Sequence, residues 1–491
     1  FPYRWGHAFW AYVGGRWGDK VIGNLFTAGI TLGLERGLEE VLGLSAEQFS
    51  QDWIAAIRRD YDAVVRARTA PSNAGRRLLP QGELRDAYVS PTVSPDGSKV
   101  IFLSTKSLFT FDLYLADAQS GEIEAKLVSA DADPHFDALR FLDSAGTWSP
   151  DGRKFAFVVF AKGDNEIAIL DVASRKVERR IKPRGLSALW NPAWSPDGRS
   201  LAFSGAKGAA TDLYVLDLES EALRQVTDDL YADLQPAWSP DGKTLAFTSD
   251  RGEGTDLVTL RYAPRAIWLV DAAGGTPRAV APFSTAQQVN PAFAPSGREI
   301  YFLSDREGVT DLYRLDLGGE LAQVTRIATG VSGITSLSPA LSVASRSGRV
   351  LFSVFEDTSY AIHALEPAAA RGAPVEPDRA EPAIAGLLPP VRAEARSIVQ
   401  SYLDDSAPSP AEARREFDLA EYDAKLRLDY IAPIAGVSIS SFGNIVGGDL
   451  TAQFGDMLGE HTVGATLYGA NGGTLEAFGA EAYYLNREQR W

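Results

Sequence analysis

The chain has 491 residues, of which 45% are hydrophobic, so it can bury substantial cores and is predicted to form about two to four domains. Its 48 Lys and Arg against 64 Asp and Glu give a formal charge of −16, a field that repels phosphate backbones and argues against a nucleic-acid partner. The absence of cysteine excludes disulfides, thiolate-bound metals and thiol catalysis, and it suits an oxidising periplasm.

Residues 1–68 are predicted to be a helical segment, because Ser45 and Gln48 form a capping box ahead of an apolar run. The stretches 2–10 and 14–19 resemble the region downstream of the active site in gluzincin-type peptidase domains. That resemblance implies a His-Glu-x-x-His zinc motif upstream, with the glutamate as general base. The chain contains no such motif, so no zinc ligand is assigned to it.

A turn motif recurs six times through the centre of the chain. Four exact copies of Ser-Pro-Asp-Gly precede two altered copies, and successive glycines lie 55, 46, 44, 55 and 51 residues apart. Proline presets φ, aspartate bonds locally and glycine accepts a positive φ, so each copy predicts a hairpin turn and not a ligand site. Repeats of about 40 to 50 residues with several strands are typical of propeller blades. The copies lie at 94–97, 149–152, 195–198, 239–242, 294–297 and 345–348.

Each repeat predicts four strands. In the third repeat, apolar strands at 192–194 and 201–204 flank the turn, an alternating strand follows at 212–217, and a more polar outer strand lies at 223–227. The sixth repeat lacks an outer strand of its own. A spare segment of this type precedes the first repeat at 76–79, and we expect it to complete the sixth sheet so that no edge stays open.

These repeats resemble the TolB-like and WD-type propeller repeats of bacterial envelope proteins, and the similarity covers about residues 75–366. The resemblance implies a mainly β fold with a six-bladed β-propeller, located in the periplasm of a Gram-negative bacterium. Propellers include both binding proteins and enzymes, so the fold alone assigns no activity.

The last part of the chain changes character twice. Residues 367–421 are rich in proline and alanine and predict a linker with one short helix near 411–417. Residues 422–491 alternate apolar and polar positions between glycine-rich turns and, with the segments 456–461 and 484–487, resemble the first strands of the bacterial surface antigen type of outer-membrane barrel. A barrel needs about eight strands or more, so a partial antiparallel barrel is expected, with a small soluble β domain as the alternative.

The sequence assigns no catalytic, cofactor-binding or metal-binding residue. A serine hydrolase with a nucleophile elbow would need Gly-x-Ser-x-Gly, which the chain lacks. His7 lies among aromatic residues and is expected to be packed and structural. His135 and His363 are also interpreted as structural, and His461 beside Glu460 as solvated.

Acidic loop residues could gather at one rim and bind Ca²⁺, because hard cations take clustered carboxylates. The favoured interpretation is a solvated acidic rim. The residues concerned are Asp131, Asp133, Asp228, Asp229 and Asp233. The Ser-Asp-Arg triplets at 249–251 and 304–306 recur at equivalent places and predict hydrogen bonds within each sheet.

The chain begins at Phe1 and is interpreted as part of a longer envelope protein. The predicted function is a propeller module that binds protein or peptide at one rim and is linked to the outer membrane through the C-terminal barrel. One alternative is the accessory propeller of a zinc metallopeptidase whose motif lies upstream. Another is a soluble propeller hydrolase with a buried Ser-His-Asp group.

Overall fold

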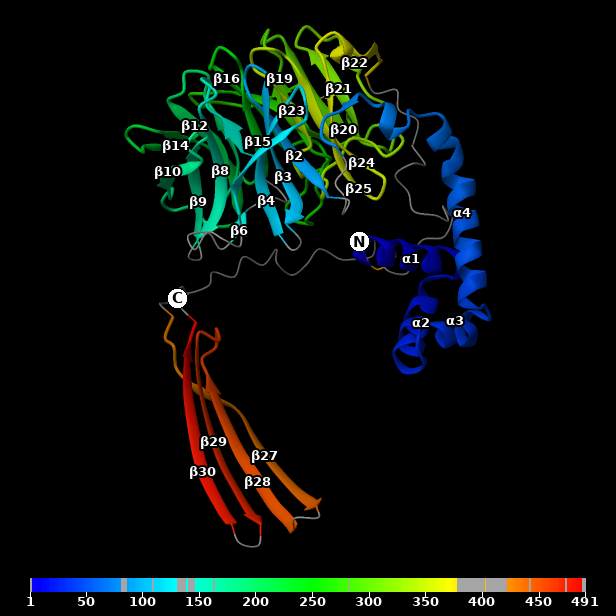
Figure 1. The fold of residues 1–491 in the computed structure, drawn as a ribbon, viewed down its shortest axis with the longest axis vertical. Helices are drawn as coiled ribbons and strands as arrows, with labels where there is room; N and C mark the ends of the chain where they lie inside the picture. Colours follow the sequence, from blue (N-terminus) through cyan, green and yellow to red (C-terminus); the bar gives the residue numbers. More distant parts are fainter. Residues whose placement is uncertain are drawn as a thin grey trace. The chain divides into compact units, whose positions relative to one another are not determined.

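The computed structural model describes residues 2–80, 86–107, 110–129, 138–139, 146–161, 164–280, 282–377, 402, 422–440, 443–472 and 475–487. The chain divides into two compact units, residues 1–409 and 410–491. Figure 1 shows helices at the start of the chain, a group of sheets in its middle part and a sheet of long strands near its end.

Four helices form the first part of the chain, as predicted. They are α1 (Pro2–Trp17), α2 (Asp19–Leu32), α3 (Leu34–Leu42) and α4 (Ala46–Arg66). The capping box is present, because Ser45 Oγ accepts the Gln48 N–H and Gln48 Oε1 accepts the Ser45 N–H. Tyr12, Leu25 and Phe49 belong to the core between the helices. None of the described helices has the length and apolarity that spanning a bilayer would require.

Six antiparallel sheets of four or five strands follow in the described part of residues 76–374. The first sheet contains β2 (Tyr88–Val93), β3 (Lys99–Ser107), β4 (Thr110–Asp117) and β5 (Ile123–Val128). The second sheet contains β6 (Ala138–Leu139), β7 (Thr147–Trp148), β8 (Lys154–Ala161), β9 (Asp164–Asp171) and β10 (Lys176–Ile181). The third sheet contains β11 (Ala188–Trp194), β12 (Ser200–Lys207), β13 (Ala210–Asp217) and β14 (Leu223–Gln225). The fourth sheet contains β15 (Asp233–Trp238), β16 (Thr244–Ser249), β17 (Ala266–Asp271) and β18 (Arg278–Ala279). The fifth sheet contains β19 (Gln288–Phe293), β20 (Glu299–Ser304), β21 (Asp311–Asp316), β22 (Leu321–Gln323) and β26 (Ala373–Pro374). The sixth sheet contains β23 (Leu341–Val343), β24 (Val350–Glu356), β25 (Ser359–Leu365) and β1 (Arg76–Arg77).

Buried apolar side chains pack between each sheet and the next. A sheet covered on both faces needs apolar residues on both faces of its middle strands, which explains the nearly continuous apolar runs in the sequence. The sixth sheet shares such a cluster with the first. The shared clusters include Leu103 with Phe157, Val158 with Phe203, Val215 with Phe247, Leu269 with Ile300, Leu303 with Phe352, and Ile362 with Phe102.

The Ser-Pro-Asp-Gly motifs form the predicted turns. In the third sheet, Ser195 Oγ donates to the Asp197 carboxylate at 2.6 Å and accepts the Ser200 N–H at 2.9 Å. Asp197 also accepts the Arg199 N–H at 3.0 Å, and these hydrogen bonds, that of Ser195 foremost, hold its pKa below the usual value. Gly198 closes the turn with a φ of 78°, a conformation that favours glycine. The first, second and fourth sheets repeat these bonds.

Neighbouring turns contact each other. A Cβ added at Gly198 would lie 3.9 Å from Cδ of Pro150, the proline of the preceding turn. The sixth turn meets the first, because the Arg346 N–H donates to Pro95 O at 2.8 Å. The six turns therefore form one continuous edge, called the turn rim below. The same glycine–proline contact recurs at Gly152, Gly242, Gly297 and Gly348.

The predicted pairing of the segment 76–79, called the closing strand below, with the sixth sheet is confirmed. β1 pairs antiparallel with β25, with Arg76 opposite Ala364. The Leu78 N–H then donates to Ile362 O at 2.8 Å, and the Leu78 side chain is buried. A Cβ added at Gly121, in the turn between β4 and β5, would lie only 1.9 Å from Leu78 O. The closing strand is thus held by the sixth sheet and packed closely against the first.

The segment after the sixth sheet is partly structured. A 3₁₀ turn, η2 (Ala369–Arg371), precedes β26, in which Ala373 lies opposite Gln323 of β22. The linker predicted to start at residue 367 therefore begins with residues that extend the fifth sheet. The helix predicted near 411–417 lies outside the described residues.

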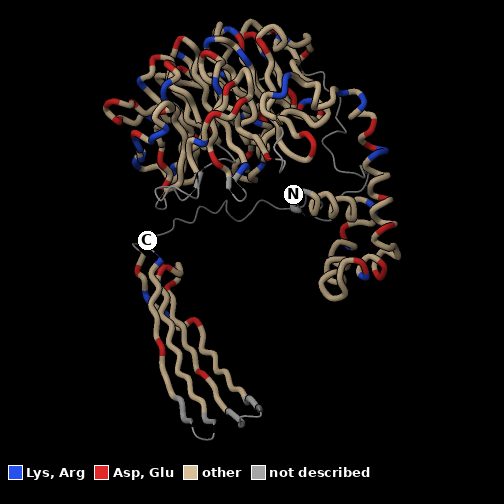
Figure 2. Tube along the Cα trace, in the orientation of Figure 1, with Lys and Arg blue, Asp and Glu red and all other residues tan. Residues whose placement is uncertain are grey.

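The second unit contains one sheet of antiparallel strands, which confirms the predicted hairpins. The order is β27 (Arg427–Ser440), β28 (Gly443–Gly455), β29 (His461–Gly472) and β30 (Leu475–Asn486). These strands have 12 to 14 residues, more than any strand of the propeller region that the structure describes. Figure 2 shows few charged residues along their described parts.

The two faces of this sheet differ in composition. Residues that lie opposite each other on neighbouring strands share a face. The apolar face, defined by this register, carries Leu428, Phe454, Val463 and Tyr484, then Ile431, Ala452, Ala465 and Ala482, then Pro433, Leu450, Leu467 and Ala480. The other face is mixed: it carries the polar residues Asp449, Thr451, Gln453, Thr466 and Glu481 together with Ile434, Tyr430, Tyr468 and Tyr483. On the apolar face, Leu450 is 44% exposed and Leu467 49% exposed.

Candidate binding site

A hollow of about 560 Å³ opens at the turn rim, where the inner strands of the sheets converge. Each of the six sheets contributes the last residue of its inner strand, just before the turn, and all six residues are aromatic or aliphatic. Pro95, Pro150, Pro196 and Pro240 of the turns also line the hollow. The sequence therefore places one apolar side chain per repeat at the same point. These residues are Val93, Trp148, Trp194, Trp238, Phe293 and Val343.

The indole N–H groups of this hollow are already bonded to the protein. Trp148 Nε1 donates to Thr92 O at 2.9 Å, and Trp238 Nε1 donates to Ala193 O at 3.0 Å. The indole rings are thereby fixed in orientation. The hollow accordingly offers rigid apolar surface, which a ligand can cover without ordering loose side chains.

Polar residues in a strained conformation lie just below this hollow. Asn191, Gln235 and Asn290 have φ of 50°, 56° and 54°, at β-bulges in the inner strands. Each precedes a proline, and such left-handed conformations cost non-glycine residues about 1 to 2 kcal/mol. The sequence interpretation missed these positions. The signal that would have found them is the repeated dipeptide of a polar residue and proline at the start of an inner strand.

Hydrogen bonds between sheets hold two of these residues. Gln235 Nε2 donates to Leu337 O at 2.9 Å, and Gln235 Oε1 accepts the Asn290 N–H at 2.8 Å. Asn290 Oδ1 accepts the Ala340 N–H at 2.8 Å. These contacts connect the fourth, fifth and sixth sheets. A second hollow of about 230 Å³ is lined by Asn191 and Gln235, next to the prolines that line the first.

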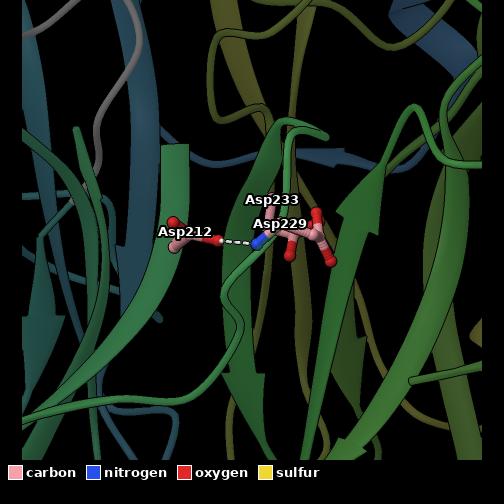
Figure 3. A group of neighbouring side chains, drawn as sticks. All are labelled: Asp212, Asp229 and Asp233. Atoms are coloured by element: carbon pink, nitrogen blue, oxygen red, sulfur yellow. Dashed lines mark hydrogen bonds between the residues drawn. The ribbon is translucent and has the colours of Figure 1, made fainter. Parts of the chain in front are cut away.

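Three aspartates gather between the third and fourth sheets (Figure 3). One carboxylate oxygen of each of Asp212, Asp229 and Asp233 lies within 4.8 Å of the others. Asp229 and Asp233 therefore gather, which was the less favoured of the two interpretations, and Asp233 is buried, so the favoured solvated rim is wrong for this residue. Asp212 was not among the expected residues, and Asp228 approaches it through Gln225, whose Nε2 contacts both carboxylates. Asp131 and Asp133 lie outside the described residues.

A buried arginine neutralises part of this cluster. Arg251 Nη2 lies 3.0 Å from Asp229 Oδ2 and 2.5 Å from Asp233 Oδ2, and its Nε donates to Ser249 Oγ at 3.0 Å. The bonds of Arg251 to Ser249 and Asp233 lie within the fourth sheet, as the triplet at 249–251 predicted. Burial raises the pKa of Asp233 to about 6. Carboxylates are suitable ligands for a hard cation, but the guanidinium already bridges two of the three.

Three equivalent aspartates at the start of the third strands have different partners. Asp112 pairs with Lys126 at 3.0 Å, and Asp212 accepts from the Gln225 amide at 3.0 Å. Asp311 pairs at 2.5 Å with Arg68, which lies just after α4. The Arg68 side chain is only 2% exposed, so this ion pair ties the end of the helical segment to the fifth sheet.

The histidines occupy separate places. His363 is buried, 3.2 Å from Glu356, with its ring stacked on Phe352. His461 stacks on Tyr484 in the second unit. His7 is exposed on α1, so its expected packing is wrong. His135 lies outside the described residues.

The antiparallel sheets, the turn rim and the shared hollow define a β-propeller. Residues 144–262 match the family model of the TolB beta propeller domain, PD40. The TolB-like character that the repeats predicted is thus confirmed for the propeller fold. The proposed peptidase-type resemblance of the helical segment and the surface-antigen resemblance of the last strands stay predictions.

Several solved structures are similar to this chain. They include a putative TolB from Agrobacterium tumefaciens (21% identity, 49% of this chain and 80% of that chain, TM-score 0.40) and TolB from Acinetobacter baumannii (19% identity, 68% and 72%, TM-score 0.41). A third comes from a study of two prolyl endopeptidases (13% identity, 89% and 56%, TM-score 0.37). No curated protein matches the chain.

Proposed function

We propose that residues 75–366 form a closed six-bladed propeller that acts as a binding module for a protein or peptide. The observation that carries this proposal is the hollow at the turn rim, with one apolar residue from each sheet. Proline and tryptophan side chains pack well against an extended peptide, because they present flat apolar surface and lose little conformational freedom. The ligand would therefore insert an extended segment at the turn rim.

A peptide-display selection on the full chain tests this proposal. Ala237 lines the hollow, and Ala237→Lys would place a long charged side chain there. Selected peptides should lose about tenfold or more in affinity for this variant, since a buried lysine must be desolvated. Leu230→Lys is the matched control, because Leu230 is 72% exposed and does not line the hollow. Peptides that bind the Ala237 variant as well as the unmodified chain would refute the site.

We further propose that residues 422–491 belong to an outer-membrane-type barrel, which would place the propeller in the periplasm of a Gram-negative bacterium. The support is the apolar face of the C-terminal sheet, opposite a mixed face, in strands of 12 to 14 residues. A membrane-spanning strand needs about 9 to 11 residues. Residues after the fifth-sheet extension, up to 421, would then act as the linker.

The accessory role in a zinc metallopeptidase is kept as an alternative proposal. It rests on the resemblance of residues 2–19 and on no contact in the structure. The test is the longer gene sequence. A His-Glu-x-x-His motif encoded upstream would support it, and its absence from a complete reading frame would exclude it.

A further inference from the structure

The hollow at the turn rim has a neighbour on one side. A neighbouring hollow of about 440 Å³ lies between the fourth and fifth sheets, and Pro240 and Phe293 line both. Because they share these two lining residues, the two hollows adjoin, and together they are called the rim groove. An extended segment in the central hollow could therefore leave along this path.

The altered turn motifs change the charge of the rim at this groove. In the fourth sheet, Asp241 stands beside the basic Lys243, and the carboxylate accepts the Ser239 hydroxyl at 2.6 Å. In the fifth sheet the equivalent position is Ser296, yet Arg298 still follows the glycine. The turn of the fifth sheet has thus lost its acidic residue and kept its basic one.

One arginine, Arg278, lies in the groove itself, whereas Arg298 lines neither hollow. Arg278 is exposed on β18 and lines the outer hollow together with Ser296 and Gly297. Within the described residues, neither Arg278 nor Arg298 forms a salt bridge. Asp241 also lines this hollow, but its oxygens accept from Ser239 and the Lys243 N–H, and these bonds hold its pKa low. The Asp241 carboxylate therefore stays ionised but is engaged by these bonds, whereas the Arg278 guanidinium has no ion pair in the described part of the chain and is the charge left for a ligand.

We propose that the rim groove binds an extended acidic peptide, with a carboxylate at Arg278 and apolar residues in the central hollow. This inference rests on the proposed peptide-binding function and names the chemistry of the ligand. A guanidinium binds a carboxylate with two parallel hydrogen bonds, which adds specificity for position as well as affinity. The net charge of −16 makes a basic peptide the expected partner of the protein as a whole, so an acidic preference would have to come from this local surface.

The display selection described above provides the probe, with random peptides held inside a carrier protein so that they have no free C-terminus. Acidic residues should be enriched next to apolar ones. For synthetic copies of the selected peptides, Arg278→Glu should weaken binding by about fivefold, and added salt should weaken binding to the unmodified chain. Comparing synthetic peptides that have a free C-terminus with amidated ones shows whether the group that binds at Arg278 is the terminal carboxylate or an acidic side chain.

Arg224→Glu is the matched control. Arg224 lies opposite Val215 in the third sheet as Arg278 lies opposite Leu269 in the fourth, and it lines neither hollow. This variant has the same change of charge and should bind normally. Selected peptides without acidic residues, or equal effects of the two substitutions, would overturn the inference. If the peptides still lose affinity for the Ala237→Lys variant, the peptide-binding function stands; if no peptide is selected, that function fails.

Discussion

The propeller sheets and the C-terminal sheet use the same unit, antiparallel strands joined by short turns, but they differ in how much apolar surface they cover. Phe302 and Phe352 are fully buried between propeller sheets, whereas Leu450 is 44% exposed and Phe478 is 82% exposed. The cause lies in the strand patterns. Propeller middle strands are apolar on both faces, and the C-terminal strands are apolar on every second residue.

This difference in covered apolar surface indicates which contacts stabilise each region. A propeller sheet is stabilised by the sheets on either side of it, so changes at the contacts between sheets should unfold it. The C-terminal sheet has one apolar face that its own strands do not cover, so changes on that face should affect association with lipid. Matched substitutions can test each half of the comparison.

The largest effect is expected at the ion pair of Arg68 and Asp311. Arg68→Gln would leave a fully buried carboxylate without its cation and should destabilise the propeller by about 3 to 5 kcal/mol. Lys126→Gln at the equivalent Asp112 should cost only about 1 kcal/mol, because Lys126 is 43% exposed. Urea unfolding measures both. Asp311→Asn should restore much of the loss in the Arg68 variant, and equal costs for the two single variants would contradict the difference in burial.

The next effect tests the closing strand. Gly121 has φ of 78°, and its substitution by alanine should cost about 2 to 4 kcal/mol, from the left-handed backbone and the clash with Leu78 O. Gly208→Ala has a similar φ of 62° with open space around it, and should cost about 1 to 2 kcal/mol. Hydrogen exchange at the Leu78 amide should speed up in the Gly121 variant alone. Unchanged exchange there would show that the strand does not depend on this contact.

A smaller effect is expected on the C-terminal sheet. Leu450→Arg on the apolar face should weaken association of the full chain with phosphatidylcholine vesicles by about 2 kcal/mol, or about thirtyfold. Thr451→Arg, the adjacent residue on the mixed face, should have little effect. Vesicle flotation gives the bound fraction. Loss of association in both variants, or in neither, would remove the distinction between the faces.

The last effect concerns pH. Burial raises the pKa of Asp233 to about 6 from 3.8, so the folded state holds this proton more tightly than the unfolded state. Its contribution to stability is present below the lower value and is lost as the pH rises through about 6. Asp233→Asn should remove that change from the urea midpoint. Asp241→Asn should alter the pH profile in the opposite sense, because the Ser239 hydroxyl holds the pKa of Asp241 low. Profiles that shift in the same sense would contradict both assignments.

The repeat-based features could be predicted from the sequence because their causes are local. A proline, an aspartate and a glycine in order specify the turn, and counting strands located the spare segment at 76–79. The apolar residue before each turn was visible as part of a buried strand. Its role in the hollow was not, since that requires the inner strands of all six sheets to converge.

The remaining site features depend on residues far apart in the chain. Arg68 and Asp311 are separated by 243 positions, and no spacing rule connects them. The acidic loop at 228–233 was recognised, but Arg251 was assigned only to hydrogen bonds within its own sheet and was not paired with these carboxylates. The strain at Gln235 is compensated by partners in other sheets, which a single repeat does not contain.

The closing strand also has a mechanical consequence. Tension applied to the helical segment would reach the ion pair of Arg68 with Asp311 first, and only then the pairing of Arg76 and Arg77 with β25. The ion pair would therefore bear the tension before the paired strands β1 and β25 do. A domain of this design could bear tension from its helical end without separating β1 from β25, for as long as that buried ion pair holds.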